Sequence, residues 1–480
     1  MTLLRIATCA LLAASSAAVG DLQGDVQKIV NSSDLNQGIA GISIIDMGTG
    51  ESLVSLNASK LMIPASNQKL LTTGTAIHVL GPSFAFKTRL FLDDQNLIIV
   101  GDGDPTIGDV ELQNISNWAN ENAMLEDELK PWVDAVKSSG VDTIETLFVD
   151  DRIFDQNFVH PSWPSKQINN WYCAQVSGLN YHLNVVHLYP SPRSGKTAAL
   201  GNIAPRMNWV SLGNRTTSKT GKGSTSSFWV ARLPNTNKMT ARGNVNATHT
   251  VPVKVAFHDP AIVLGNTFAD MLRKNGITVG KVSHVDAKRS PNLGSLLHTH
   301  STPIQSTLQR SNTDSHNLYA ETLLKRIAAQ ATGRSGTFDE GGKVVKAVLE
   351  QRLNAPCPRV HAADGSGMSR KNQISPSILA RWLASFDLDD VAGKTLLESL
   401  ATPGSGTLDS RFTGVDLQGA TVHAKSGYLR GVCALSGFIT FPNRASLVFS
   451  ILVNNVQGTV KGAKSMQERI VAAAIKSASN

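Results

Sequence analysis

The chain has 480 residues, enough for two or three domains with sizeable cores. Its hydrophobic share of 41% and charged share of 17% are typical of a globular protein and exclude a largely disordered one. The formal charge of +8 comes from scattered lysines and arginines without basic runs, so we expect no nucleic-acid partner, whereas a protein peripheral to an anionic cell wall or membrane fits.

The first 20 residues have the pattern of a secretory signal peptide. Arg5 supplies a positive charge, residues 6–14 form a short apolar core, and residues 15–20 are the small residues typical of a cleavage site. The apolar core is too short to cross a bilayer. We therefore expect residues 1–20 to be removed from a secreted or periplasmic protein of the cell envelope, the alternative being an uncleaved N-terminal anchor.

The next elements predicted are a β-hairpin and a helix. Two β-rich runs, residues 41–46 and 51–56, flank a Gly-rich turn. A helix follows between Pro64 and Leu80, and Ser66 falls at or near its first turn. Backbone N–H groups at that end of a helix favour developing negative charge.

The middle of the chain carries mixed signals. Residues 87–100 predict two strands, and residues 111–138 predict a helix. Residues 200–250 are rich in Gly, Asn, Ser and Thr with short apolar runs, which indicates a small β-rich module. A strand over 251–256 and a helix over 262–275 are predicted next.

The C-terminal part predicts three strands, at 420–425, 433–441 and 445–453, and a closing amphipathic helix at 461–478. Together with the first hairpin, these strands complete one antiparallel sheet with flanking helices, an α+β fold built by both chain ends. The predicted domains are residues 21–82 with 300–480 as one domain, and 83–299 as an insertion of two smaller domains with an inner β-rich module at about 185–250.

Cysteine and histidine spacing predicts no metal site and no cofactor. Beyond the signal, Cys173, Cys357 and Cys433 are far apart and match no zinc spacing, and either one disulfide or buried thiols fits them. His182 and His187 have no acidic partner in a metalloprotease pattern, so we expect them to be packed or surface residues.

Three short strings carry most of the chemistry. A serine needs a base to act as a nucleophile, and a lysine three residues later on a helix lies on the same face. The two later strings supply a second hydroxyl, an amide and a second cation. The strings are Ser66-Asn67-Gln68-Lys69, Ser315-His316-Asn317 and Lys425-Ser426-Gly427.

Each string is weak alone, and their order and setting give them weight. Ser66 is the only serine followed three positions later by lysine. Lys219-Thr220-Gly221 competes with the third string, but it precedes Ser315 and lies in a loop-like stretch. Lys425 closes a strand-like run, where a bound acyl chain can pair with the strand edge.

The strings resemble the three signatures of penicillin-recognising serine enzymes. Ser66 and Ser315 are 249 residues apart, which resembles the penicillin-binding protein 4 type of D-alanyl-D-alanine carboxypeptidase/endopeptidase, with two extra domains in that interval. Two departures are Ser426 in place of the usual threonine and His316 inside the second string. Further matching strings are Gly103-Asp104-Pro105-Thr106, His160-Pro161-Ser162-Trp163-Pro164, Asp364-Gly365-Ser366-Gly367-Met368-Ser369-Arg370 and Gly431-Val432-Cys433-Ala434-Leu435-Ser436-Gly437.

The resemblance implies a β-lactamase/transpeptidase-like catalytic domain that acts on peptidoglycan stem peptides and is acylated by β-lactams. Ser66 would attack the carbonyl between two D-alanines, with Lys69 as base. Ser315 would pass a proton to the leaving amine, Lys425 would hold it electrostatically, and Asn317 would orient the substrate amide and Lys69.

The resemblance also implies substrate-binding residues. The backbone N–H groups of Ser66 and Tyr428 would hold the oxyanion. Ser426 and Gly427 belong to the string that, with Lys425, would receive the peptide carboxylate. Asp150 would contact the amino group of a diaminopimelate side chain, although an exposed aspartate turn explains it as well.

Two other functions remain open. A β-lactamase or serine esterase could use the same three strings, but no Glu-x-x-Leu-Asn string for deacylation follows Ser315. A non-catalytic cell-wall-binding protein would leave the work to the inserted domains, and the intact serines and lysines argue against it. The balance between carboxypeptidase and endopeptidase action is not fixed by the sequence.

Overall fold

The computed structural model contains two compact units. It describes residues 22–112, 120–221, 223–286 and 292–479. The first unit comprises the chain up to Pro82, residues 308–316 and residues 338–480, and the second comprises residues 83–307 and 317–337. The predicted signal peptide, residues 1–20, lies outside the described residues. No described helix is both long enough and apolar enough to cross a membrane.

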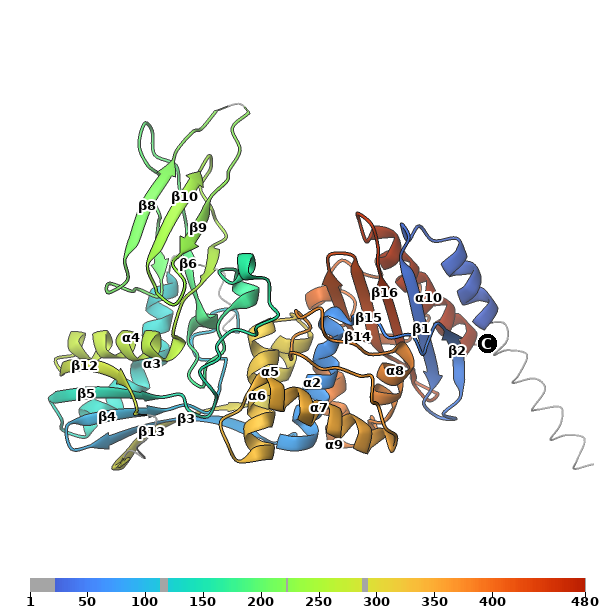
Figure 1. Ribbon diagram of the computed structural model, residues 1–480, viewed down its shortest axis with the longest axis horizontal. Coiled ribbons are helices and arrows are strands. Elements are labelled where there is room, and N and C mark those ends of the chain that lie inside the picture. The colour runs from blue at the N-terminus through green and yellow to red at the C-terminus, as the bar shows by residue number, and fades with distance from the viewer. Residues whose placement is uncertain (1–21, 113–119, 222, 287–291, 480) are drawn as a thin grey trace, which may run out of the picture. The chain divides into compact units, whose positions relative to one another are not determined.

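The first unit is built on a five-stranded antiparallel sheet in the order β14-β15-β16-β1-β2. Its strands are β1 (Ile39–Asp46), β2 (Ser52–Leu56), β14 (Thr421–Leu429), β15 (Val432–Thr440) and β16 (Leu447–Asn454). Strand β1 pairs with β16, with Ile42 opposite Ile451. The N-terminal hairpin and the C-terminal strands therefore form one continuous sheet (Figure 1).

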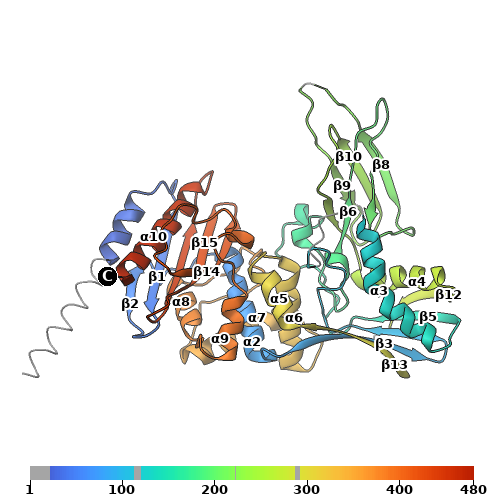
Figure 2. The same cartoon turned by 180° about the vertical axis from the view of Figure 1, so that it is seen from behind.

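Helices cover both faces of this sheet because its strands alternate apolar side chains between two cores. Ile42 and Ile44 share a buried core with Leu22, from the helix over residues 22–31, and with Met466 of α10 (Lys461–Ser479). These two helices lie on the same face (Figure 2). On the other face, a side chain at Gly41 would meet α8 (Pro376–Ala384). The other helices of this unit are α2 (Gln68–Leu80), α7 (Phe338–Leu353), α9 (Val391–Glu398) and the end of α5 (Ile304–Asn312).

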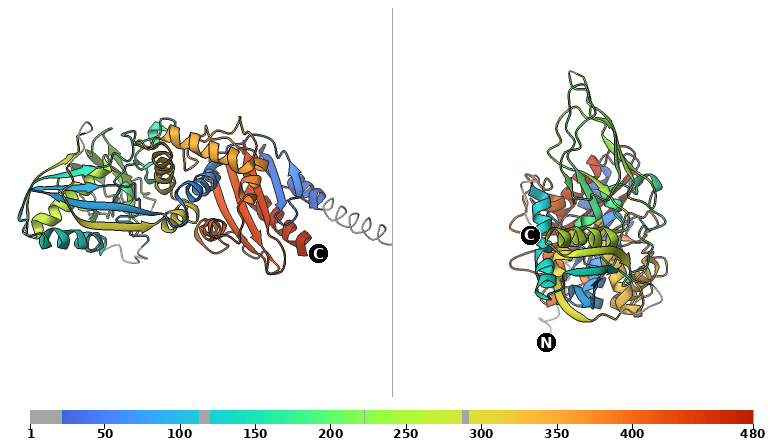
Figure 3. Two further views of the ribbon diagram at one scale, coloured as in Figure 1. Left: turned by 90° about the horizontal axis from the view of Figure 1, so that it is seen from below. Right: turned by 90° about the vertical axis from the view of Figure 1, so that its left-hand side faces the viewer.

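The second unit is built on a mixed sheet in the order β12-β5-β4-β3-β13. Its strands are β3 (Ala85–Asp93), β4 (Asn96–Val100), β5 (Thr143–Asp150), β12 (Thr278–His284) and β13 (Ser295–Pro303). Helices α3 (Glu121–Ser138) and α4 (Pro260–Lys274) pack on it, and Trp132 and Phe268 meet edge to face at 5.8 Å between ring centroids. Both helices lie on one side of the sheet (Figure 3).

Two smaller sheets complete the second unit together with α6 (Asn317–Thr332). The first is β8 (Leu212–Thr217), β10 (Met239–Asn244) and β9 (Trp229–Arg232), and the second is β11 (Val253–Ala256), β6 (Val185–Leu188) and β7 (Ile203–Ala204). These short strands fall in and around the Gly-, Asn-, Ser- and Thr-rich stretch expected to be β-rich.

The predicted α+β fold class, with an antiparallel sheet and flanking helices supplied by both chain ends, is confirmed. The predicted domain boundaries stay a prediction. The helix expected from residue 111 begins at Glu121: residues 111–112 form a turn, and residues 113–119 lie outside the described residues. The three described cysteines, Cys173, Cys357 and Cys433, are buried and form no disulfide with one another, which resolves the open question of a disulfide among them.

Candidate active site

Ser66 lies in the short 3-10 turn η1 (Ala65–Asn67), which runs directly into α2. Ala65 adopts a left-handed backbone conformation, with a φ of +48°. A Cβ at Gly367 would lie 1.8 Å from the Ala65 carbonyl oxygen, so only glycine fits there. The backbone before Ser66 is thus held in an uncommon conformation by a tightly fitted neighbouring loop.

Lys69 is one helical turn after Ser66 and is completely buried. Its Nζ lies 3.3 Å from Ser66 Oγ and donates a hydrogen bond of 2.8 Å to the Ser366 carbonyl. Serine and lysine three residues apart share one face of the helical segment, as their spacing predicts. The Lys69 amine is therefore positioned within reach of the Ser66 proton.

The loop over residues 364–370 positions the carbonyl that receives Lys69. The two carboxylate oxygens of Asp364 accept the backbone N–H groups of Gly367 at 2.9 Å and Ser369 at 2.6 Å. Thr72 of α2 donates to the Gly365 carbonyl at 2.8 Å. Asp364 is fully buried, and its carboxylate satisfies backbone N–H groups inside this turn. The hydrogen bond from Thr72 attaches the loop to the helix that carries Lys69.

Strand β14 lies against the start of this helical segment. The side-chain amide of Asn67 donates to the Lys425 carbonyl at 2.6 Å. A Cβ at Gly427 would lie 3.0 Å from both the Pro64 carbonyl oxygen and the Ser66 backbone nitrogen. Glycine in the Lys-Ser-Gly string therefore permits a close approach of the strand backbone to Ser66.

Lys425 is a second fully buried lysine at the same site. Its Nζ donates to the Ser426 carbonyl at 2.9 Å. Burial, together with repulsion from the Lys69 charge, holds the pKa of Lys425 well below its ordinary value, and the Asp314 carboxylate opposes this shift. An anion brought to Lys425 would favour its charged form.

The outer edge of β14 is partly covered. Ala424 donates its backbone N–H to the Ala401 carbonyl at 2.8 Å, so the backbone N–H and C=O groups of Ala424 point away from β15. Backbone groups alternate along a strand, and those of Ser426 and Tyr428 therefore point to the same outer edge. Tyr428 is 61% exposed, and β14 is the last strand of the sheet. This stretch can accept an extended peptide.

Ser315 lies between α5 and α6 with a φ of +61°. The segment before it is anchored to the first unit, because the Asn312 amide donates to Thr73 Oγ1 at 3.1 Å and to Ser399 Oγ at 2.8 Å. Thr313 Oγ1 also donates to the Ser399 carbonyl at 2.9 Å. The first unit therefore contains Ser66, Lys69, Ser315 and the Lys425-Ser426-Gly427-Tyr428 stretch.

The other two predicted site residues lie in the second unit. Asn317 is the first residue of α6, and its amide donates to the Tyr172 carbonyl at 2.9 Å. Asp150 ends β5, and its two carboxylate oxygens accept from Arg152 Nε and Nη2, each at 2.7 Å. Asp150 is thus buried in a two-point ion pair rather than placed on an exposed turn.

The third string differs from its expected setting. The strand predicted to close at Lys425 continues to Leu429, because Ser426 and Gly427 pair with Leu435 and Ala434 of β15. Pairing with a neighbouring strand outweighs the weak strand preference of glycine. The competing Lys219 is exposed in the second unit, whereas Lys425 is buried beside Lys69.

The sequence did not reveal two features of the structure. One depends on a backbone carbonyl group, and the other depends on side chains that are far apart along the chain. The Ser366 carbonyl has no side-chain signature, although the matching Asp364–Arg370 string marks its loop. In the second unit, Glu121, His182 and His187 form the one group in the described part of the chain that could hold a metal ion. His182 is separated from Glu121 by 61 residues, so no local pattern reveals the pair.

Comparison with known proteins gives one consistent family. The model of the D-Ala-D-Ala carboxypeptidase 3 (S13) family matches residues 22–476. The chain is 29% identical to the D-alanyl-D-alanine carboxypeptidase of Actinomadura sp. (strain R39), over 95% of this chain and 85% of the relative. It is 24% identical to the penicillin-sensitive carboxypeptidase A of Dictyostelium discoideum, over 87% and 82%. The crystal structure of penicillin binding protein 4 from Haemophilus influenzae shares the fold, with a TM-score of 0.76 at 22% identity over 93% of this chain and 97% of that one.

Proposed function

Because the chain belongs to the D-Ala-D-Ala carboxypeptidase 3 (S13) family, we propose that Ser66 forms the acyl-enzyme with peptidoglycan stem peptides. The chain is a serine-type D-Ala-D-Ala carboxypeptidase, a hydrolase. The observation that carries the assignment of Ser66 is its 3.3 Å separation from the buried Nζ of Lys69, at the start of a helix. No other serine in the chain is followed three positions later by lysine.

The acylation step follows from this pairing. The Ser66 proton moves to Lys69 as Oγ bonds to the carbonyl carbon between the two D-alanines. The resulting oxyanion receives hydrogen bonds from the backbone N–H groups of Ser66 and Tyr428. The C–N bond then breaks, Ser315 gives its proton to the leaving amine, and D-alanine departs.

The second step is hydrolysis of the ester. Ser315, which gave up its proton in the first step, takes one proton from water as the water oxygen adds to the acyl carbonyl. The tetrahedral intermediate then breaks its bond to Ser66 Oγ, Lys69 returns to this oxygen the proton taken in the first step, and the shortened peptide is released. The enzyme regains its starting protonation state, so each cycle consumes one water and releases one D-alanine.

The substrate carboxylate provides the anion that the Lys425 site favours. Burial and the Lys69 charge keep the pKa of Lys425 low, so a bound carboxylate stabilises its charged form. Ser426 adds a hydroxyl donor next to it, and Gly427 permits the close approach of β14 to Ser66. Binding of a C-terminal carboxylate and alignment of the scissile amide are thereby coupled.

Asn317 and Asp150 have further predicted roles in substrate binding. Asn317 follows Ser315 by two residues, and we keep its predicted role in orienting the substrate amide and Lys69. Asp150 is predicted to contact the diaminopimelate amino group, but both of its oxygens already accept from Arg152. Any such contact must share the carboxylate with this arginine.

The expected setting is the cell envelope, where peptidoglycan peptides are the substrates and β-lactams acylate the same serine. The name of the Dictyostelium relative describes it as penicillin-sensitive, which supports this expectation. Export is supported by the signal-like pattern of residues 1–20. We also propose that the enzyme cleaves cross-linked stem peptides, as a D,D-endopeptidase.

Purified protein should be assayed for D-alanine release from a pentapeptide and for cleavage of cross-linked muropeptides. We expect D-alanine release by the wild type and by Ser218→Ala, a serine of the competing string, and no release by Ser66→Ala. Turnover of a chromogenic cephalosporin without D-alanine release would instead identify a β-lactamase. Inactivity of the wild type on all three substrates would favour a cell-wall-binding protein.

A further inference from the structure

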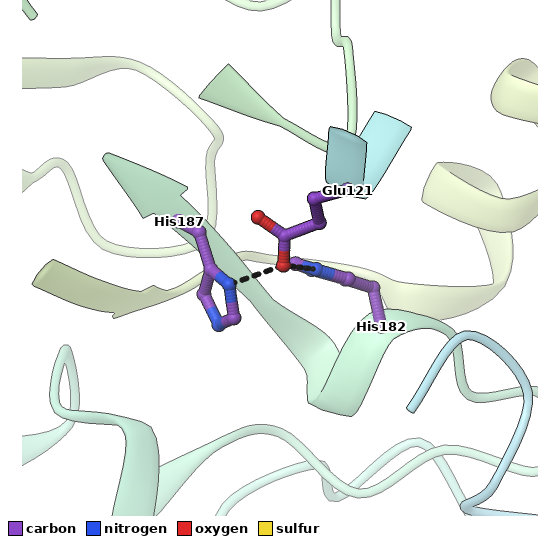
Figure 4. A group of neighbouring side chains, drawn as sticks. All are labelled: Glu121, His182 and His187. Atoms are coloured by element: carbon purple, nitrogen blue, oxygen red, sulfur yellow. Dashed lines mark hydrogen bonds and ion pairs between the residues drawn. The ribbon is translucent and has the colours of Figure 1, made fainter. Parts of the chain in front are cut away.

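The second unit contains a cluster of three fully buried side chains, Glu121, His182 and His187. His182 Nε2 lies 2.9 Å and His187 Nδ1 lies 2.6 Å from the same oxygen, Glu121 Oε1 (Figure 4). The two imidazole rings are 4.4 Å apart between centroids. A carboxylate and two imidazoles thus converge on one point away from solvent.

The protons of this cluster can be partly assigned from its partners. His182 Nδ1 lies 2.7 Å from the Val185 carbonyl oxygen, which only accepts hydrogen bonds, so Nδ1 carries the proton. In the neutral ring, Nε2 then directs a lone pair at Glu121 Oε1. Two acceptors facing each other require a cation between them, either a proton or a metal ion.

Neighbouring groups hold His182 and Glu121 in place by hydrogen bonds, as the residues around the ligands of a metal site usually do. The Val185 carbonyl fixes the tautomer of His182, and the Tyr189 hydroxyl donates to Glu121 Oε2 at 2.9 Å. Glu121 Oε2 lies beside Oε1 and offers a fourth donor atom. Two histidines and a carboxylate are a ligand set that zinc accepts.

The backbone that presents His182 is also uncommon. His182, Leu183 and Asn184 all have positive φ values, of 50°, 56° and 56°. Asn184 holds this turn: its side chain accepts the Tyr181 N–H at 3.0 Å and donates to the Gln175 carbonyl at 2.7 Å. Non-glycine residues in this conformation carry a strain that concentrates at functional sites.

We propose that Glu121, His182 and His187 bind a divalent transition-metal ion of the zinc class. Zinc lies about 2.0–2.2 Å from such ligands, so neighbouring ligand atoms are about 3.4 Å apart in a tetrahedral site. Opening the present separations of 2.6 and 2.9 Å to that value takes shifts of less than about 1 Å. The ion would join the first turn of α3 to the turn before β6 and to β6 itself. Because all three ligands are closed off from solvent, this is a structural site.

Metal content and stability of the full chain test the proposal. The protein is purified without chelator, and the number of zinc ions per chain is measured by inductively coupled plasma mass spectrometry. We expect about one zinc per chain in the wild type and in His249→Gln, a control histidine in the same unit. Zinc content should fall at least about tenfold in His187→Gln and Glu121→Gln.

Two measurements on the wild type keep the test independent of variant folding. Zinc added to chelator-treated protein should raise Tm by about 5 °C. Cobalt in place of zinc should give the visible absorption of a low-symmetry site, which the wild type and His249→Gln share. The proposal would be overturned if the purified protein contained no zinc and its Tm did not change when zinc was added. The cation between His182 and Glu121 would then be a proton. Acylation by penicillin is scored separately, so failure here leaves the role of Ser66 untouched.

Discussion

The two units bury charge in opposite ways. In the first, Lys69 and Lys425 are both fully buried and repel each other, and Asp314 only partly offsets the shift in the Lys425 pKa. In the second, the Glu121 carboxylate lies within 2.9 Å of one nitrogen of each of two histidines and accepts a hydrogen bond from the Tyr189 hydroxyl. The lysine site is therefore favourable for an incoming anion, whereas the histidine site is closed around its own carboxylate.

The lysine site is therefore suited to binding a ligand, whereas the cluster of Glu121, His182 and His187 is suited to stabilising the fold. Buried like charges are costly unless an opposite charge arrives, and β14, the strand that carries Lys425, is the last strand of its sheet. Buried opposite charges with satisfied partners hold elements together. The predictions below change a serine, a lysine and a loop glycine at the first site, and then a histidine that pairs with two carboxylates elsewhere in the second unit.

The largest effect is expected at Ser66. Replacing Ser66 by alanine removes the proposed acyl acceptor, so kcat for D-alanine release should fall by about 10⁴-fold or more. Ser218→Ala should keep wild-type activity, since it lies in the competing string of the second unit. Residual activity of Ser66→Ala above a hundredth of the wild type would contradict the assignment of the nucleophile.

Removing the second buried cation should cost less. Lys425→Ala is expected to lower kcat/KM by about 10²–10³-fold, because the carboxylate and the developing charge lose their partner. The variant should still fold, since it no longer buries an amine whose charged form is disfavoured by burial and by the Lys69 charge. Lys219→Ala is the matched control and should leave kcat/KM unchanged; equal loss in both variants would argue against the Lys425 site.

The loop behind Ser66 offers a purely geometric test. Gly367→Ala places a Cβ 1.8 Å from the Ala65 carbonyl oxygen, so the backbone before Ser66 must shift. A displacement near 1 Å typically costs about 10²-fold in rate. Gly404→Ala has nearly the same φ, +84° against +85°, in open space, and controls for backbone strain. Similar kcat values in the two variants would show that this contact does not position Ser66.

The smallest effect concerns His284 in the second unit, whose pKa is raised to about 10 by Asp151 and Asp259. The folded pKa exceeds the unfolded value of 6.5, so this stabilisation is complete below pH 6.5 and is lost as pH rises through about 10. His284→Gln should cost about 1 kcal/mol at pH 6, a value limited by solvent screening, and less at pH 9. Denaturant unfolding at both pH values checks it, and a difference independent of pH would contradict the ion pair.

The sequence predicted what depends on local spacing. Ser66 and Lys69 share a helix face, so three residues of separation bring their side chains together. The two chain ends carry short apolar runs rich in β-branched residues, which is enough to predict one antiparallel sheet. The order of the three strings along the chain then distinguished Lys425 from the competing Lys219.

What the sequence left out depends on contacts between distant segments. Nothing near His182 points to Glu121, because the two residues meet only after α3 and β6 have packed. The strand through Lys425 looked shorter than it is, since its pairing with β15 is not visible in its own residues. The exposed turn that was the alternative reading of Asp150 is wrong for a local reason, because Asp150 pairs with Arg152 two residues away and is buried.

Intact-protein mass spectrometry after treatment with a penicillin, followed by peptide mapping, tests the assignment of Ser66 as the nucleophile most directly. If Ser66 is the nucleophile, one covalent adduct per chain forms on Ser66 in the wild type and in Lys219→Ala, and none forms in Ser66→Ala. An adduct on another residue, labelling of Ser66→Ala, or an unlabelled wild type would contradict it.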